Sequence, residues 1–408
     1  MNKLFDAENI TLTPKQQFIC DKAIDWYHNS SEQIFQFAGN PGTGKTVTLK
    51  GIIKRLNLSP FQVAFMSYVG NAAINMRING LSGAKTIHST IYDTIEEVVI
   101  DEYGNPVMNK YFNRPETQHR RIRKKLDDID LFVIDEAGTV PLRMRNDIVG
   151  YGKKILCCGD LDQMPPVGDS PAFLTSGHVY VLDEILRQNK NSAVIYLCQR
   201  AKLGLPIHVG VYGNEVIVME EKDFKYIQGM MLPLANTILC GKNETRDKYT
   251  NILRYEILKK QDILPDFGEK LMCRINDWNI ESGGINLTNG LIGRVMNQPD
   301  VSSFDGKCFR INFMPDSADA PFFDIPVDYT FFTADHETRR QMKNFNYCVG
   351  EAMEYGYCQT VNTAQGSQWN TGIYFEEWLP SHNNERNYTA LSRFRKQCIY
   401  VKKDRKYW

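Results

Sequence analysis

The sequence feature that most constrains the fold is the glycine-rich segment Gly39-Asn40-Pro41-Gly42-Thr43-Gly44-Lys45-Thr46. It follows the apolar run 34–37 and precedes residues 45–56, whose apolar side chains recur at helical spacing. A strand, a tight loop and a helix in this order are typical of a phosphate-binding loop, because glycines let backbone N–H groups point inward and the helix N-terminus adds its positive dipole end. The pattern predicts that a polyphosphate binds here. Lys45 would reach its β- and γ-phosphates, and the Thr46 hydroxyl would ligate Mg²⁺.

Two carboxylates stand at the end of a second apolar strand. Residues 131–134 are continuously apolar, as in a strand buried on both faces, and Asp135 and Glu136 follow directly. After a phosphate-binding loop, this pair predicts that Asp135 holds the Mg²⁺ and that Glu136 orients and deprotonates the attacking water. A further strand over 154–158 leads to Gln163. Gln163 precedes a rigid Pro-Pro pair, so its amide is a candidate sensor of the γ-phosphate.

Bulk properties exclude several classes of protein. The length of 408 residues predicts two or three domains. Lys plus Arg and Asp plus Glu both total 48, which argues against a uniformly basic surface but permits a locally basic channel. Ten cysteines without a C-x-x-C pair indicate reduced thiols rather than a disulfide framework or a zinc site. No apolar stretch is long enough for a membrane span, and we expect a soluble, cytoplasmic protein.

The alternation of strands and helices predicts an α/β fold with two domains, each interrupted once. Only the first domain contains a phosphate-binding loop, so the useful charges of the second are expected to be arginines. The first domain is predicted to take residues 1–92 and 130–178, and the second to take 179–267 and 348–408.

Both predicted insertions are rich in β-structure signals. In the insertion 93–129, residues 98–108 are typical of a β-hairpin with a Gly-Asn turn. The basic run 119–125 that follows is either a solvated helix face or a phosphate contact. The insertion 268–347 has short strands between turn signals, which predicts a small β-barrel.

Four polar residues have two interpretations each. Gln16 either completes a capping box with Thr13 or pairs with the edge of adenine, since its amide offers a donor and an acceptor. His88 follows a strand end and is either structural or a ligand contact. Arg187 and Arg393, in the second half, either form surface ion pairs or face the nucleotide bound by the first half.

Taken together, these segments resemble the motifs of superfamily-one DNA helicases of the RecD- and Dda-like group, and the resemblance spans nearly the whole chain. The first half carries segments similar to the Q motif and motifs I, Ib, II and III, namely Leu12-Thr13-Pro14-Lys15-Gln16, Gly39 to Thr46, Thr86-Ile87-His88, Asp135-Glu136-Ala137 and Gly159 to Val167. The second half carries segments similar to motifs IV, V and VI, namely Leu182 to Gln188, Thr360 to Ser367 and Tyr388 to Arg393. The compact length resembles phage-type members.

The resemblance implies two RecA-like domains that hydrolyse ATP with Mg²⁺ in the cleft between them, with Arg187 and Arg393 completing the site. It implies a monomer that moves 5′ to 3′ on single-stranded DNA and opens forked duplex, with replication or recombination proteins as possible partners. It also implies that the hairpin is a wedge or pin and that 268–347 is an SH3-like barrel. The nucleotide would further contact Gln16 and Gly366. The nucleic acid would contact Thr86, His88, Tyr103, Thr360, Asn362 and Gln365.

Two segments depart from the family pattern. Motif Ia usually reads Thr-Gly-Lys-Ala-Ala, where this chain has Val69-Gly70-Asn71-Ala72-Ala73, and motif V has Asn362-Thr363 in place of the common His-Lys. Both changes fall on expected DNA contacts and leave the hydrolytic residues unchanged. Other functions therefore stay open: a single-strand translocase or RNA remodeller, another P-loop NTPase such as a small-molecule kinase, or a binding module with a relic ATP site.

Overall fold

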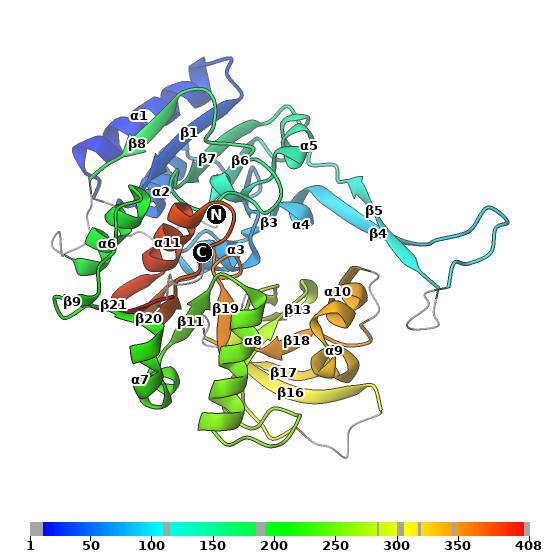
Figure 1. Ribbon diagram of the computed structural model, residues 1–408. Coiled ribbons are helices and arrows are strands. Elements are labelled where there is room, and N and C mark those ends of the chain that lie inside the picture. The colour runs from blue at the N-terminus through cyan, green and yellow to red at the C-terminus, as the bar shows by residue number, and fades with distance from the viewer. Residues whose placement is uncertain are drawn as a thin grey trace. The chain divides into compact units, whose positions relative to one another are not determined.

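The computed structural model describes residues 11–108, 115–184, 192–283, 285–299, 306–316, 320–344 and 348–403 (Figure 1). The chain forms two compact units: one contains Met1–Thr86, Asp127–Lys260 and Tyr357–Trp408, and the other contains Ile87–Leu126 and Gln261–Gly356. The first unit holds two sheets of mainly parallel strands. We call these sheets, with their helices, lobe 1 and lobe 2. Within the described ranges, no helix combines the length and the apolar character that a membrane crossing requires.

Lobe 1 is built on a six-stranded parallel sheet with the order β3-β2-β6-β7-β1-β8. Its strands are β1 (Ile34–Gly39), β2 (Val63–Ser67), β3 (Lys85–Thr86), β6 (Leu131–Asp135), β7 (Lys154–Gly159) and β8 (Val179–Leu182). Its helices are α1 (Pro14–Asn29), α2 (Lys45–Leu56), α3 (Gly70–Ile78) and α5 (Arg145–Val149), with the 3₁₀ turns η1 (Ala137–Thr139) and η2 (Leu142–Met144). The central strands are almost wholly buried, which explains their continuous apolar sequences.

The predicted boundary between the two α/β domains is wrong at residue 179. β8 pairs in parallel with β1 at the edge of the lobe 1 sheet, from Gln36↔Val179 to Gly39↔Leu182. Tyr180 of β8 stacks on a phenylalanine of β1 with ring centroids 5.0 Å apart. A strand at a sheet edge carries no local signal of which sheet it joins, so lobe 1 extends to Leu182 rather than ending at 178.

The first helix begins where its capping residues predict. The Thr13 hydroxyl accepts a hydrogen bond from the backbone N–H of Gln16 (3.3 Å), and Gln16 Oε1 accepts one from the N–H of Thr13 (2.9 Å). This capping box stabilises the helix by about 1 kcal/mol. The buried face, with Ile19, Ala23 and Trp26, packs with α2 in the core of lobe 1.

Lobe 2 is built on a second six-stranded sheet with the order β19-β11-β20-β21-β10-β9, parallel except for β9 at the edge. Its strands are β9 (Gly210–Tyr212), β10 (Val216–Glu220), β11 (Thr237–Cys240), β19 (Cys358–Thr360), β20 (Trp369–Phe375) and β21 (Phe394–Lys402). Its helices are α6 (Ala193–Lys202), α7 (Glu221–Leu234), α8 (Asn243–Asn251) and α11 (Asn383–Ser392), and the π-helical turn η3 (Ile252–Ile257) follows α8. Two sheets of this kind flanked by helices confirm the predicted α/β fold class.

The second unit contains a long two-stranded ribbon, β4 (Tyr92–Val98) with β5 (Thr117–Arg123), preceded by the short helix α4 (Ile87–Ile91) (Figure 1). The predicted turn lies in the connection between these strands, where the N–H of Gly104 donates to the carbonyl of Asp101 (3.0 Å). The interpretation of 119–125 as a helix face is wrong, because most of that run forms β5 in register with β4. A run of charges has no apolar period that would separate a strand from a helix.

The rest of this unit is an antiparallel sheet with the order β17-β16-β15-β12-β18. Its strands are β12 (Lys270–Cys273), β15 (Ile292–Val295), β16 (Cys308–Pro315), β17 (Phe322–Asp328) and β18 (Met353–Tyr355), accompanied by the hairpin β13 (Asp277–Ser282) and β14 (Ile285–Leu287) and by α9 (Tyr329–Thr333) and α10 (His336–Asn344). A bridge joins Val327 of β17, at one edge of the sheet, to Glu351, just before the other edge strand β18, which supports a small barrel. β18 lies beyond the predicted boundary at 347, so the barrel takes a strand from the segment assigned to the second α/β domain.

Candidate active site

The glycine-rich loop connects β1 to α2 as the sequence predicts. Gly42 and Gly44 have φ angles of 85° and 82°, in the left-handed region that favours glycine. A Cβ on Gly39 would collide with the Thr43 hydroxyl and would lie 2.9 Å from Leu182 Cβ, so only glycine fits at the end of β1. Lys45 Nζ donates a hydrogen bond to the carbonyl of Gly39 (2.7 Å), so its side chain reaches from the end of the glycine-rich loop back to the loop's first residue.

A cavity of about 330 Å³ opens between this loop and lobe 2. Of the predicted catalytic and cofactor residues it is lined by Asn40, Pro41, Gly42, Gly44, Lys45, Thr46, Asp135, Glu136, Gln163, Gly366 and Arg393. Gly39 and Thr43 are buried within the loop. Residues more than 300 positions apart in the sequence therefore meet at one site, and they carry both signs of charge.

Gln163 links the two lobes at the centre of this cavity. The hydrogen-bond network assigns the orientation of its amide. In that orientation its nitrogen donates to Glu136 Oε2 (3.2 Å) and its oxygen accepts from Arg393 Nη2 (2.8 Å). Arg393 is 2% exposed, and its Nε donates to the carbonyl of Thr389 (3.1 Å). The guanidinium of lobe 2 is thus held in place against a carboxylate of lobe 1 through a single glutamine.

The environment of Glu136 suits a general base. Burial raises the pKa of Glu136 above its usual range, the Arg393 guanidinium opposes this shift, and the charge of Asp135 adds to it. A carboxylate with a raised pKa accepts a proton more readily near neutral pH. The backbone of Glu136 also adopts a left-handed conformation (φ 52°), which is uncommon outside glycine and clusters at functional sites.

Asp135 and Thr46 offer oxygen ligands on the same cavity. Asp135 Oδ1 accepts hydrogen bonds from the N–H of Glu136 (2.9 Å) and from the Cys158 thiol (3.1 Å). A hydroxyl and a carboxylate fit Mg²⁺, which prefers oxygen and takes its other positions from water and substrate phosphates. In the part of the chain that the structure describes, no three His, Cys, Asp or Glu side chains gather as a metal cage.

Gln16 serves the fold in two ways. Besides its part in the capping box, its Nε2 lies 3.3 Å from the carbonyl of Thr43 and donates to it, which ties α1 to the phosphate-binding loop. Gln16 is 1% exposed, so both ends of its amide are used inside the protein. The capping role is confirmed. A contact with adenine stays a prediction and would require the amide to exchange one of these bonds.

The segment that resembles motif V lies between the lobes. Gly366 has a φ of 78°, and its carbonyl accepts a hydrogen bond from Asn75 Nδ2 of lobe 1. Gln365 is 7% exposed, and its Nε2 donates to the carbonyl of Met164 (3.2 Å). The amide predicted to contact nucleic acid is therefore engaged in a bond between lobes.

The other predicted nucleic-acid contacts are spread over both units. The Thr360 hydroxyl lies 3.0 Å from that of Thr363, and Thr86 is buried at the end of β3. His88 is in α4, with its ring 6.0 Å from that of Tyr92, and Tyr103 is 80% exposed. The contacts of these residues and of Asn362 with nucleic acid stay predictions. Arg187 lies outside the described residues.

Four polar cavity-lining residues escape sequence reasoning: Asn75 of α3, Asn79 just after it, and Gln368 and Arg395 of lobe 2. Arg395 Nε donates to Gln368 Oε1 (2.9 Å). Arg395 lies in β21, and its only signal in the sequence is that it follows Arg393 by two positions. The two asparagines have no comparable signal, since amides on a short helix are ordinary surface residues.

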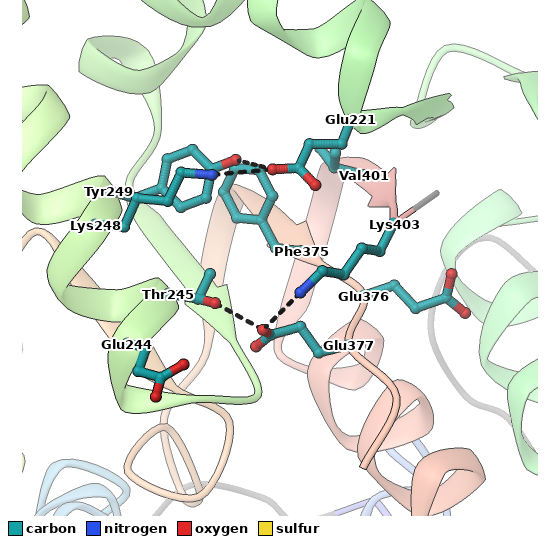
Figure 2. Close-up of a pocket in the computed structure, with 10 residues that line it drawn as sticks. All are labelled: Glu221, Glu244, Thr245, Lys248, Tyr249, Phe375, Glu376, Glu377, Val401 and Lys403. Atoms are coloured by element: carbon teal, nitrogen blue, oxygen red, sulfur yellow. Dashed lines mark hydrogen bonds and ion pairs between the residues drawn. The ribbon is translucent and has the colours of Figure 1, made fainter. Parts of the chain in front are cut away.

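A second cavity, of about 320 Å³, lies in lobe 2 (Figure 2). Four glutamates but only two lysines line it, namely Glu221, Glu244, Glu376, Glu377, Lys248 and Lys403. Glu377 Oε2 accepts hydrogen bonds from the N–H groups of Gly241 and Lys242 (both 2.7 Å), just before α8. These two amides are therefore bound by a carboxylate of the chain itself.

Comparisons with known proteins place this geometry in context. Residues 22–169 match the family described as AAA domain. The chain is 28% identical over 294 residues to "Uncharacterized protein R530" of Acanthamoeba polyphaga mimivirus, which covers 61% of this chain and 57% of that protein. It is 24% identical over 182 residues to the "ATP-dependent DNA helicase PIF1" of Trypanosoma brucei brucei, which covers 42% of this chain and 18% of the relative. The chain therefore spans little more than half of the first of these proteins and less than a fifth of the second.

Solved structures match along almost the whole chain. The Pif1 helicase from Candida albicans superposes with a TM-score of 0.56 at 17% identity, covering 96% of this chain and 94% of that one. A structure of two coordinating Pif1 helicases at forked double-stranded DNA gives 0.58 at 18% identity, covering 96% and 92%. Pif1 from Bacteroides in complex with ADP-AlF3 and single-stranded DNA gives 0.55 at 17% identity, with the same coverage. The chain therefore has the fold of these helicases, in agreement with the resemblance in its motifs.

Proposed function

We propose that the chain is an ATP-dependent DNA helicase that hydrolyses ATP between lobes 1 and 2 and moves along single-stranded DNA. The observation that carries this proposal is the contact of Gln163 with Glu136 of lobe 1 and Arg393 of lobe 2. When groups from two lobes meet at one phosphate-binding loop, the reaction depends on closure of the lobes. The similarity to Pif1 structures that contain ADP-AlF3 and single-stranded DNA supports ATP and DNA as the ligands.

In this mechanism each lobe supplies half of the chemistry. Lys45 and the loop amides bind the triphosphate, and Glu136 takes a proton from the water whose oxygen attacks the γ-phosphorus. The bond from that phosphorus to the bridging oxygen breaks, and ADP takes up the electron pair. Arg393 balances the charge that builds up on the transferred group. Mg²⁺, held by Thr46 and Asp135, would neutralise charge on the phosphates.

The size of the arginine effect explains the coupling to movement. An arginine in this role accelerates hydrolysis by roughly 10³- to 10⁵-fold, or about 4–7 kcal/mol. Because Arg393 belongs to lobe 2 and the loop to lobe 1, fast hydrolysis requires the closed arrangement. Opening after hydrolysis then shifts one lobe relative to the other along the bound strand.

Strand opening is energetically close to balanced. Separating duplex DNA costs on average about 1.4 kcal/mol per stacked step, and stacking one base on an aromatic side chain returns roughly 1–3 kcal/mol. Hydrolysis therefore has to supply mainly direction. From the motif resemblance we propose movement 5′ to 3′ by a monomer, with the β4–β5 ribbon and the exposed Tyr103 acting as the pin that splits the fork.

The first experiment measures phosphate release with and without single-stranded DNA for the Lys45→Ala variant. We expect loss of DNA-stimulated hydrolysis with strand binding retained, because the lysine acts on the phosphates. Lys54→Ala is the matched control, since Lys54 is an exposed lysine on the same helix, and it should hydrolyse ATP like the wild type. Normal turnover by the Lys45 variant would refute the site.

The second experiment separates the helicase from its alternatives. Strand displacement is measured on DNA and RNA forks with 5′ or 3′ overhangs. A DNA helicase of the proposed polarity opens DNA with a 5′ overhang. Hydrolysis without stimulation by single strands would instead indicate another P-loop NTPase, and stimulation without displacement would indicate a translocase.

A further inference from the structure

Lobe 2 holds the γ-phosphate sensor segment of lobe 1 through side chains that the hydrolytic mechanism does not use. The segment runs from Asp160 to Met164 and directly follows β7. The Tyr388 hydroxyl donates to Asp160 Oδ2 (2.7 Å). The N–H of Met164 donates to Thr389 Oγ1 (2.9 Å), and the carbonyl of Met164 accepts from Gln365 Nε2 (3.2 Å).

These bonds lie in the interior of the protein. Asp160 is 4% exposed, Tyr388 2%, Thr389 0% and Gln365 7%. By contrast, the ion pair of Lys202 with Asp162 (2.6 Å) joins the same segment to lobe 2 from a partly exposed position. A buried hydrogen bond to a carboxylate is stronger than an exposed ion pair, so the interior set dominates the attachment.

The three side chains also reach the catalytic groups and the motif V segment. Gln163 lies inside the gripped segment, one residue before Met164. The carbonyl of Thr389 accepts the Nε–H of Arg393 (3.1 Å), so one residue holds the sensor segment and the arginine together. Gln365 belongs to the segment 360–366, which carries the predicted strand contacts and approaches α3 through Gly366.

We propose that Tyr388, Thr389 and Gln365 form an interlobe latch that positions Gln163 and Arg393 for hydrolysis and transmits the state of the motif V segment to them. Tyr388 and Gln365 are positioning residues, because they act through Gln163. Gln365 thereby gains a role different from direct contact with nucleic acid. A strand that orders residues 360–366 would align Gln365 with Met164, and the latch would convert strand binding into faster hydrolysis. The proposal rests on the helicase function above.

The test compares two tyrosine variants that each lose one buried hydroxyl. Tyr388→Phe removes the bond to Asp160, and Tyr374→Phe removes a bond of 2.7 Å to Asn387 that lies entirely within lobe 2. Both should lower thermal stability similarly. Only Tyr388→Phe should lower the DNA-stimulated kcat, by about 10- to 100-fold, because the lost bond is to a carboxylate. The KM for ATP should stay within about threefold of the wild type, since the phosphate-binding loop is in lobe 1.

A double-variant measurement distinguishes positioning from general weakening. If Tyr388 acts through Gln163, Tyr388→Phe has little further effect on kcat in the Gln163→Ala background. Asp160→Asn retains an acceptor for the Tyr388 hydroxyl and should retain more activity than Asp160→Ala. The latch would be overturned if the losses of kcat in Tyr388→Phe and Gln163→Ala were additive, or if Tyr388→Phe and Tyr374→Phe had equal kcat values. The helicase function would still stand in either case, provided that DNA stimulates hydrolysis by the wild type.

The opposite pattern is also informative. If the wild type hydrolyses ATP without stimulation by DNA, the helicase function fails, and transmission from a bound strand fails with it. The positioning role is then judged on the basal kcat, where the same non-additivity with Gln163→Ala is required. A wild-type chain without hydrolysis would refute both.

Discussion

A single methyl group at Gly366 provides a sharp test of lobe closure. In Gly366→Ala the new Cβ would lie 2.7 Å from Ala72 N, 2.8 Å from Ala72 Cβ and 2.9 Å from Ala72 Cα. Two of these atoms belong to the backbone of lobe 1 and the third is bonded directly to it, so none can move like the end of a flexible side chain. The lobes would have to separate here by roughly 0.7 Å to reach ordinary contact.

That displacement is large for the chemistry at this site. The bond from Arg393 Nη2 to Gln163 is 2.8 Å long, and an added distance of roughly 0.7 Å would take it beyond the range of a good hydrogen bond. A misplacement of about 1 Å costs on the order of 10²-fold in rate. We therefore expect the DNA-stimulated kcat of Gly366→Ala to fall by about 10- to 100-fold, or about 1.4–2.7 kcal/mol, with the KM for ATP nearly unchanged.

Gly83 supplies the matched control for backbone strain. Its φ of 77° nearly equals the 78° of Gly366, but a Cβ at Gly83 would meet nothing within 4 Å. Gly83→Ala and Gly366→Ala thus share the cost of placing alanine in the left-handed region, about 1–2 kcal/mol, which thermal unfolding measures. Only Gly366→Ala adds the collision. If its steady-state phosphate release matched that of Gly83→Ala, the close approach of the lobes would not be needed for catalysis.

Two further predictions concern the base and the pin. Because burial raises the pKa of Glu136, kcat should fall on the acid side of its pH profile at a pH above the usual range of carboxyl pKa values. Arg393→Ala removes the charge that opposes this shift, so the acid-side fall of its residual kcat should move to higher pH. If the acid-side fall did not move in this variant, Glu136 would not be the base. In the turn around Tyr103, Asp101 Oδ1 accepts hydrogen bonds from the N–H groups of Tyr103 (2.9 Å) and Asn105 (2.8 Å). Shortening this turn should slow fork opening and leave DNA-stimulated hydrolysis intact. Unwinding at the normal rate in a stopped-flow assay would contradict the role of the ribbon as the pin.

Local chemistry made the first half of the site predictable. The phosphate-binding loop, Asp135 and Glu136 lie at strand ends, and both the strands and their terminal residues have a signature within a few positions of sequence. The capping box of Thr13 and Gln16 is equally local. In each case one short segment determines both the backbone conformation and the group that it presents.

What the sequence could not predict depends on contacts between distant segments. Nothing near Val179 indicates that β8 joins the sheet of β1 rather than that of lobe 2. The role of Gln365 was assigned from its motif alone, whereas its bond to Met164 depends on how two lobes pack. The basic ribbon strand was missed because charged residues carry no burial period. These failures share a cause, since tertiary pairing is not encoded by any single segment.

The two lobes share the order of five strands, but the lobe 2 cavity differs in its chemistry from the cavity at the glycine-rich loop. In lobe 1 the loop before α2 presents its amides to the cavity, and Lys45 stands beside them. In the lobe 2 cavity the amides just before α8 bind the Glu377 carboxylate, and Lys403 Nζ lies 3.7 Å from it (Figure 2). A second triphosphate would have to displace a buried anion from a cavity rich in glutamate, which electrostatics strongly disfavours. We therefore expect the triphosphate to bind at the glycine-rich loop rather than in the lobe 2 cavity, with lobe 2 contributing Arg393 and the other groups that line the cavity between the lobes.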